Sequence, residues 1–282
     1  MHETEEQQVN SEETATSGTT TLQGTPHETA EATGPHISLK ADTIFHLGSF
    51  PVTNSLLLAC IILVLFAGLA TMARKSFRLI PGKLQNLFEM FLEFFLSIMD
   101  SVFGERRLSE KYLPLIATIF LFVLFSNWFG LLPGVGSIII GPHATPLLRA
   151  PSADLNFTLA LAIISVIAAN LFGIITLGFF KHAGKFFSFK NPIAFFIGII
   201  ELVSEIAKMI SFSFRLFGNI FAGEVLLAII AFLAPYILPV PFLGLEVFVG
   251  LIQALIFSML TIVFIALATA DHSEHEEAHA TH

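Results

Sequence analysis

The sequence predicts an all-α polytopic membrane protein with five membrane helices and one interfacial amphipathic helix. The first observation is composition: of 282 residues, 54% are hydrophobic and 13% are charged, whereas soluble domains are about 25% charged. The second is the presence of five apolar runs long enough to cross about 30 Å of hydrocarbon. The third is that the last two runs are too long to stand upright, which predicts a long, strongly slanted hairpin.

The charge of the chain is concentrated in two tails. Residues 1–48 hold eight acids and one base, and residues 271–282 hold four acids and no base. The net charge of -8 therefore belongs to the tails, because the body between them carries ten acids and thirteen bases. This distribution excludes a nucleic-acid binder with a basic surface and a soluble enzyme with one modest core. We expect a polar, disordered tail at 1–48, with disorder at least to about Ser38, a membrane domain at 49–270 and a polar tail at 271–282.

Histidine and cysteine give little support for a metal or disulfide site. Four histidines of the C-terminal tail are spaced three and four apart, so they would align on a helix, but we expect a solvated, frayed end; they are His272, His275, His279 and His282. Cys60 is the single cysteine, so no disulfide framework exists. We expect it to be a small buried side chain, and we predict no bound metal and no cofactor.

Apolar runs of about 20 residues or more mark the five predicted spans; they lie at 53–73, 113–132, 155–180, 193–234 and 242–270. The segment 82–103 differs, because polar residues recur every three to four positions opposite a Leu- and Phe-rich side; these are Gln85, Glu89, Glu93, Ser97 and Asp100. We expect this segment to be a helix lying in the membrane interface with its polar face solvated.

The distribution of Lys and Arg sets the orientation. Seven lie between the first two runs and three between the third and fourth, whereas the opposite side has only Lys40 and Arg149. Positive residues favour the cytoplasmic side. The sequence therefore predicts an outside N-terminus and a cytoplasmic C-terminus.

The fourth run contains 42 residues without a proline, from Ile193 to Ala234. A continuous helix of this length would measure about 63 Å, far more than ordinary tilts of around 20° accommodate. The run must break or slant steeply. Pro235, Pro239 and Pro241 separate it from the fifth run, so the two form the predicted hairpin.

Polar residues of the fourth run fall on one side of a helical wheel. At about 100° per residue, they lie within an arc of about 120° around Arg215; they are Glu201, Ser204, Glu205, Lys208, Ser211 and Asn219. Glu224 points about 180° away from Arg215. On the fifth run, Glu246 and Gln253 share one face with Gly250.

Ionisable residues inside a membrane are functional-site hypotheses by default. Two groups of acids on either side of Arg215 suggest two aqueous half-channels that do not meet. Arginine does not release its proton, so it would block a direct leak and attract a carboxylate. Because no acid of this chain lies within one turn on the same face, we expect that carboxylate to come from a partner. The alternative is that Arg215 pairs with another helix and only locks the packing.

Four stretches of this sequence carry a family resemblance: ELVSEIAKMISFSFRLFGNIFAGEVLL at 201–227, LIQALIF..LTIVFIALA at 251–268, PSADLNFTLALA at 151–162 and NLFEMFLEF at 86–94. Together they resemble subunit a of the F-type ATP synthase. The resemblance covers roughly residues 45–270. It implies the stationary proton-translocating subunit of the membrane sector, whose partners are the c-ring of the rotor, peripheral-stalk b subunits and membrane lipid.

The resemblance also implies roles for individual residues. Arg215 matches the essential arginine that faces the c-ring. Asn219, Glu224 and Gln253 match the channel open to the outer side, and Glu201 and Ser211 match the cytoplasmic half. Some members carry His where this chain has Glu246; His and Glu titrate about two units apart, so the pH range of the outer channel would differ.

The sequence is also compatible with two other functions. No GxxxxGK[ST] phosphate loop is present, so we expect a non-catalytic subunit with no nucleotide site in this chain. The alternative function is a self-contained ion-coupled secondary transporter or channel, although such proteins often show internal repeats and no convincing repeat is visible. A third reading is a structural membrane scaffold.

Overall fold

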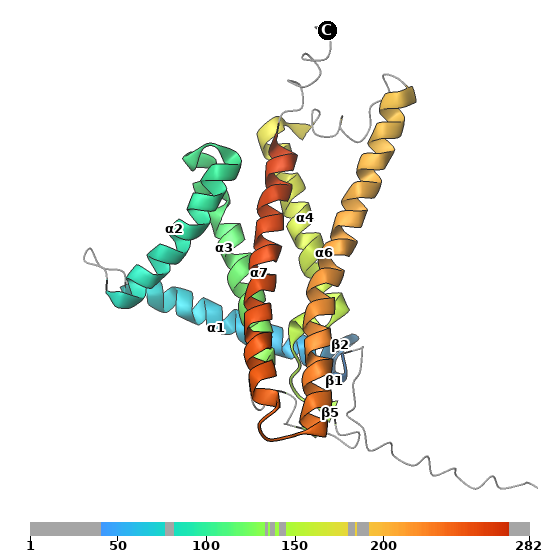
Figure 1. Ribbon diagram of the computed structural model, residues 1–282. Coiled ribbons are helices and arrows are strands. Elements are labelled where there is room, and N and C mark those ends of the chain that lie inside the picture. The colour runs from blue at the N-terminus through green and yellow to red at the C-terminus, as the bar shows by residue number, and fades with distance from the viewer. Residues whose placement is uncertain are drawn as a thin grey trace, which may run out of the picture. The chain divides into compact units, whose positions relative to one another are not determined.

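The computed structural model describes residues 41–76, 82–132, 135, 139–140, 145–179, 184 and 192–270. The chain divides into two units, Met1–Gly34 and Pro35–His282, and every described residue belongs to the second. Its helices (Figure 1) are α1 (Asn54–Ser76), α2 (Lys83–Phe103), α3 (Arg106–Gly130), the 3-10 turn η1 (Pro151–Ala153), α4 (Leu155–Leu177), α6 (Pro192–Leu233) and α7 (Pro239–Thr269). Two short antiparallel hairpins join β1 (Thr43–Leu47) to β2 (Phe50–Thr53) and β4 (Ile139–Ile140) to β5 (Thr145–Pro146).

The prediction of an all-α polytopic membrane protein is confirmed. Among the described residues, α1, α3, α4, α6 and α7 are long and apolar enough to cross a membrane, and α2 is not among them. The largest boundary difference concerns α3, which was expected from residue 113 and begins at Arg106. The reason is that the apolar run marks only the part inside the membrane, whereas the helix continues through the charged turns before it. Pro114 is accommodated inside this helix.

The helix pair α6–α7 has the lengths that its sequence predicts. Their 42 and 31 residues correspond to about 63 Å and 46 Å. Helix α7 begins at Pro239, where the missing N–H of a first-turn proline costs no helical hydrogen bond. In Figure 1 the two helices lie close together near the connecting turn and diverge toward the opposite end.

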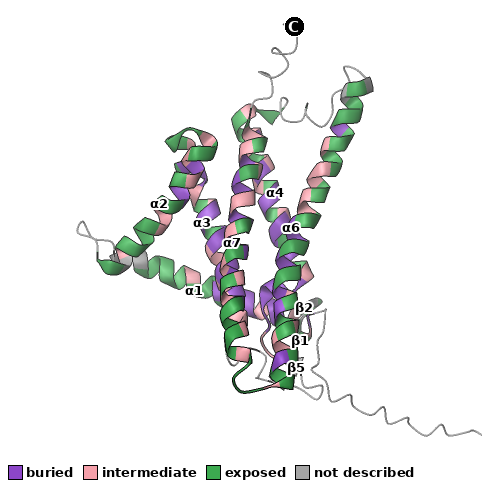
Figure 2. Ribbon diagram, viewed as in Figure 1, coloured by how far each residue is buried: buried purple, intermediate pink, exposed green. Residues whose placement is uncertain are grey.

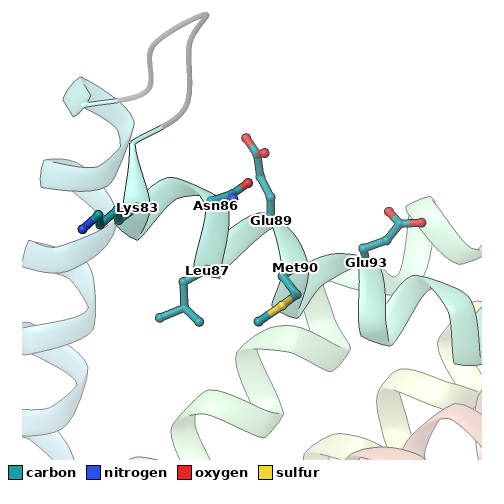
Figure 3. Close-up of a pocket in the computed structure, with 6 residues that line it drawn as sticks. All are labelled: Lys83, Asn86, Leu87, Glu89, Met90 and Glu93. Atoms are coloured by element: carbon teal, nitrogen blue, oxygen red, sulfur yellow. The ribbon is translucent and has the colours of Figure 1, made fainter.

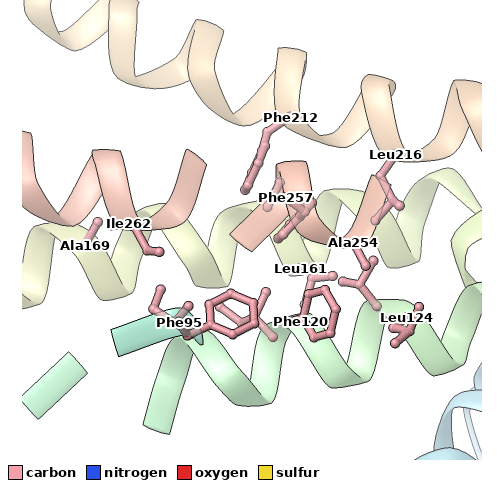
Figure 4. Close-up of a cluster of buried hydrophobic side chains, with 14 of the residues drawn as sticks. Phe95, Phe120, Leu124, Leu161, Ala169, Phe212, Leu216, Ala254, Phe257 and Ile262 are labelled. Carbon is pink, nitrogen blue, oxygen red and sulfur yellow. The ribbon is translucent and has the colours of Figure 1, made fainter. Parts of the chain in front are cut away.

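The buried core lies where α7 meets α3, α4 and α6. Figure 4 shows Phe212 of α6 lying against Phe257 of α7, with their rings stacked at 3.7 Å between centroids. Between α2 and α3, the rings of Phe95 and Phe120 pack together with their centroids 5.1 Å apart. In Figure 2 the buried residues line these contacts, and the end of α6 far from the turn is largely exposed. An exposed apolar surface of this extent is typical of a helix that faces lipid or a partner.

Two features near the N-terminus extend or correct the sequence analysis. The hairpin β1–β2 was not predicted; its two-residue turn uses Gly48 at φ 66°, a conformation that glycine adopts without strain. Cys60 was expected to be buried and is exposed on α1, because this helix buries only one stripe, which contains Leu58 and Ile62. Residues 1–40 and 271–282, with the four C-terminal histidines, lie outside the described residues.

Candidate functional site

Arg215 lies at the middle of α6, on an exposed strip whose other residues are small. The strip comprises Ser211, Arg215, Gly218 and Ala222, all exposed and recurring at three- and four-residue steps that place them on one face. A Cβ added to Gly218 would meet nothing within 4 Å. Within the described part of the chain, the guanidinium takes part in no ion pair or side-chain hydrogen bond. It is therefore available to a group outside this chain.

One turn further along α6, Asn219 contacts α7. Its Nδ2 donates to Oε1 of Gln253 at 2.6 Å. The Gln253 side chain is almost fully buried, at 2% exposed, whereas Asn219 is exposed. Gln253 Nε2 is buried and makes no hydrogen bond among the described residues. This amide pair links the strip around Arg215 to the buried face of α7.

Glu246 occupies a notch between α7 and α6. Its carboxylate fills the space where a Cβ on Gly223 would stand, so only glycine fits there without displacing it. Glu246 is 6% exposed, and its buried Oε1 has no hydrogen-bond partner in the described part of the structure. Buried polar atoms normally have a partner, which makes this carboxylate a candidate for water or proton contact.

Glu224 follows Gly223 and forms an ion pair with a residue that the sequence analysis used only for orientation. Its Oε2 lies 3.5 Å from Nη2 of Arg149, just before η1. Glu224, Glu246, Asn219 and Gln253 thus belong to the half of α6–α7 next to the connecting turn. The pairing with Arg149 has no signal in a helical wheel, because the two residues belong to segments far apart in sequence.

The N-terminal half of α6 carries a second polar cluster. Lys208 Nζ lies 2.7 Å from Glu205 Oε1, and Asn170 of α4 donates to Glu205 Oε2 at 3.3 Å. Lys208 also lies 5.8 Å from the centre of the Phe264 ring of α7. Glu201 is partly buried one turn before Glu205. The helical wheel placed these residues on one side of α6, and in the structure Glu205 on this side contacts Asn170 of α4.

Hydrogen bonds across the helices hold the site together at other positions that the sequence analysis did not single out. Asn127 Nδ2 and Trp128 Nε1 of α3 donate to the backbone carbonyls of Gly250 and Val247 at 2.9 and 3.0 Å. The hydroxyls of Thr158 on α4 and Ser213 on α6 lie 3.0 Å apart. An Asn and a Trp next to each other near the end of an apolar run are the sequence signal that could have identified Asn127 and Trp128.

A surface hollow of about 700 Å³ lies on α2, away from these residues. Figure 3 shows Glu89 and Glu93 on one side of the helix and Leu87 and Met90 on the other. The expected solvated face is present: Glu93 is 65% exposed and pairs with Arg106 at 3.1 Å. No group of three His, Cys, Asp or Glu is placed to hold a metal among the residues described.

Comparison with known proteins gives consistent matches. The family model described as ATP synthase A chain matches residues 53–266. ATP synthase subunit a of Campylobacter fetus subsp. fetus is 38% identical over 237 residues, which cover 84% of this chain and 98% of the relative. The subunit a of Moorella thermoacetica is 35% identical over 223 residues (79% and 94%), and that of Campylobacter jejuni subsp. jejuni is 40% identical over 206 residues (73% and 85%).

Proposed function

Because this chain belongs to the ATP synthase subunit a family, we propose that it is the stationary proton-translocating subunit of the membrane sector. In this proposal its partners are the c-ring of the rotor and the peripheral-stalk b subunits. It lies in a bacterial inner membrane with its N-terminus outside and its C-terminus in the cytoplasm, and nucleotide chemistry belongs to other subunits.

The observation that carries the proposal is the exposed guanidinium of Arg215. An arginine in a membrane that kept no counter-charge would cost about 2.5–3.5 kcal/mol on insertion scales. No acid among the described residues pairs with it, so a carboxylate of the c-ring is the proposed counter-charge. The small residues Ser211, Gly218 and Ala222 beside it support close approach of a rotor helix, since small side chains let membrane helices pack tightly.

The outer half-channel is assigned to the half of α6–α7 next to their turn. A proton enters past Glu224 and Glu246, passes the Asn219–Gln253 pair, and neutralises a c-ring carboxylate. Two of these side chains, Glu246 and Gln253, are buried and carry polar atoms without a hydrogen bond among the described residues, which supports a polar path at this place. The neutral carboxyl group then rotates into lipid, which the ionised form would enter only at a large desolvation cost.

The cytoplasmic half-channel is assigned to Glu201, Ser211 and Lys208 at the N-terminal half of α6. There the rotor carboxyl meets Arg215, which favours the ionised form, and its proton leaves past these residues. Since arginine stays protonated, Arg215 also blocks direct passage between the two halves. Each charge that crosses is driven by about 2.3 kcal/mol per 100 mV.

Arg215→Lys tests the proposal, because lysine keeps the charge but loses the planar fork. We expect ATP-driven proton pumping in inverted membrane vesicles to be lost while the protein inserts normally. Arg107→Lys, at an exposed arginine of α3, is the matched control and should pump normally. Unaltered pumping by Arg215→Lys would refute the role of the arginine. Co-purification of an intact c-ring with the chain separates this function from a self-contained transporter.

A further inference from the structure

The two partners of the Arg149–Glu224 ion pair differ sharply in exposure. The Arg149 side chain is 6% exposed, whereas that of Glu224 is 44% exposed, and the distance between Nη2 and Oε2 is 3.5 Å. The cation is thus enclosed by protein while the acid remains reachable. This asymmetry is what a fixed charge acting on a proton-exchanging group requires.

The backbone that carries Arg149 is firmly seated. The Cβ of Ala150 fills the space beside Gly130, where a side chain on that glycine would stand. The next residues form η1, with Ala153 N donating to Ala150 O at 3.1 Å. Asp154 then caps α4 by accepting from Asn156 N at 3.0 Å. The guanidinium is therefore held from a segment that packs on α6, α3 and α4 together.

The charged groups around Glu224 come from few elements. Helix α4 has no charged residue, and α7 has only Glu246, whose carboxylate lies against Gly223. In the 149–154 segment Asp154 is buried and occupied with its cap. Arg215 lies nine residues from Glu224, on the opposite side of α6. Of the described residues on elements packed against this part of α6, Arg149 supplies the positive charge.

Building on the proposed function, we propose that Arg149 is a positioning residue of the outer half-channel. It holds the Glu224 carboxylate in place and balances the like charge of Glu246. A cation favours the ionised form of a carboxylate, and a neighbouring acid favours the protonated form. With Arg149 present, Glu224 passes the proton that it accepts from outer water on toward the rotor and returns to a carboxylate. Without Arg149, it retains that proton.

The test measures passive proton conduction by the reconstituted membrane sector, with c-ring, as a function of pH on the outer side. In Arg149→Gln, we expect the pH of half-maximal conduction to rise by about one unit, a tenfold change in proton affinity. Arg149→Lys, which keeps the charge, should restore most of the shift. In a Glu224→Gln background, Arg149→Gln should leave the pH profile of the residual conduction unchanged.

Arg107→Gln, the same change at an exposed arginine of α3, is the control and should not move the profile. An unchanged profile in Arg149→Gln, or an equal shift in the Glu224→Gln background, overturns the inference. If Arg149→Gln does not assemble, with or without Glu224→Gln, Arg149 has a structural role and the inference fails. A wild-type sector that holds no c-ring or conducts no protons instead refutes the proposed function.

Discussion

The two halves of α6 hold their acidic side chains by different means. In the C-terminal half, Glu224 pairs with Arg149 from a separate segment. In the N-terminal half, Glu205 pairs with Lys208 three residues along the same helix. The first ion pair depends on the tertiary fold, whereas the second can form within one helix, although Asn170 of α4 also donates to Glu205 Oε2 at 3.3 Å. The difference suggests that the positions of the acidic side chains are fixed most tightly in the half of α6 next to the α6–α7 turn.

The strongest test of this comparison is Gly223→Ala. The new Cβ would overlap the Glu246 carboxylate, so α6 and α7 must separate or the acid must move. Overpacking of this kind costs about 1–3 kcal/mol. We expect lower thermal stability in detergent and at least about a tenfold loss of passive proton conduction, as in other cases of displaced functional groups.

Gly244→Ala is the matched control for that substitution. Gly244 lies two residues before Glu246, and an added Cβ would meet nothing within 4 Å. We expect it to match wild type in conduction and stability. Equal behaviour of the two variants would show that the notch at Gly223 does not hold Glu246.

Trp128→Phe asks whether hydrogen bonds across helices also fix α7. The substitution keeps an aromatic ring but removes the donor to Val247 O at 3.0 Å. We expect the free energy of unfolding to fall by about 0.5–1.5 kcal/mol. For a chain of this size, each kcal/mol lowers the thermal midpoint by roughly 2–4 °C. Differential scanning measurements on the purified protein check it.

Thr118→Val provides the local counterpart on the same helix. Thr118 is exposed, and its hydroxyl donates to Pro114 O four residues earlier, at 2.7 Å. Surface changes of this kind usually stay within about 0.5 kcal/mol. A loss as large as that of Trp128→Phe would remove the distinction between local and long-range bonds.

The pair Glu205–Lys208 should show a smaller coupling. Its side chains are 14% and 27% exposed, and pairs within one helix contribute about 0.2–0.5 kcal/mol. A double-mutant cycle with Glu205→Gln and Lys208→Gln measures the coupling in thermal unfolding. A value above about 1.5 kcal/mol would place this pair among the tightly fixed contacts and reverse the comparison.

Length and periodicity were sufficient to predict most of the fold. Five helices lie on the expected runs, and α6 has the expected 42 residues, because a membrane requires long apolar segments with internally paired backbones. Even the placement of Arg215 and Glu224 on opposite sides of the helix follows from a rotation of about 100° per residue.

Contacts between distant segments could not be predicted in the same way. A wheel gives the direction of a side chain but not the element that it meets, so Arg149 was counted only as a loop charge. Gly223 shows no pattern of its own, because its role depends on the Glu246 carboxylate of another helix. The strand pairing of Thr43–Leu47 also depends on a turn, at Gly48, rather than on an apolar period.

The smallest expected change in stability concerns an ion-pair network that links α2 and α3 and is exposed rather than buried. Arg106 is 44% exposed and pairs with Asp100 at 2.8 Å and with Glu93 at 3.1 Å, both on α2. The nearby Ser109 hydroxyl, and then the Arg106 guanidinium, hold the pKa of Asp100 below its ordinary value of 3.8. If a contact between two helices stabilised the fold equally well whether exposed or enclosed, breaking this network would lower stability as much as breaking the contacts near the α6–α7 turn.

The direction of its pH effect follows from linkage. A lowered pKa means that the folded protein binds this proton less readily than the unfolded chain. The stabilisation is therefore complete above about pH 4 and is lost as the pH falls through the lower, folded-state pKa. We expect Asp100→Asn to lower the thermal midpoint slightly at pH 6 and to converge with wild type near pH 3, because exposed ion pairs contribute little. Glu89→Gln, which alters an exposed acid bonded to Gln85 on its own helix, should show no such convergence; a constant offset of Asp100→Asn across this range would mean that its charge is not what stabilises the α2–α3 contact.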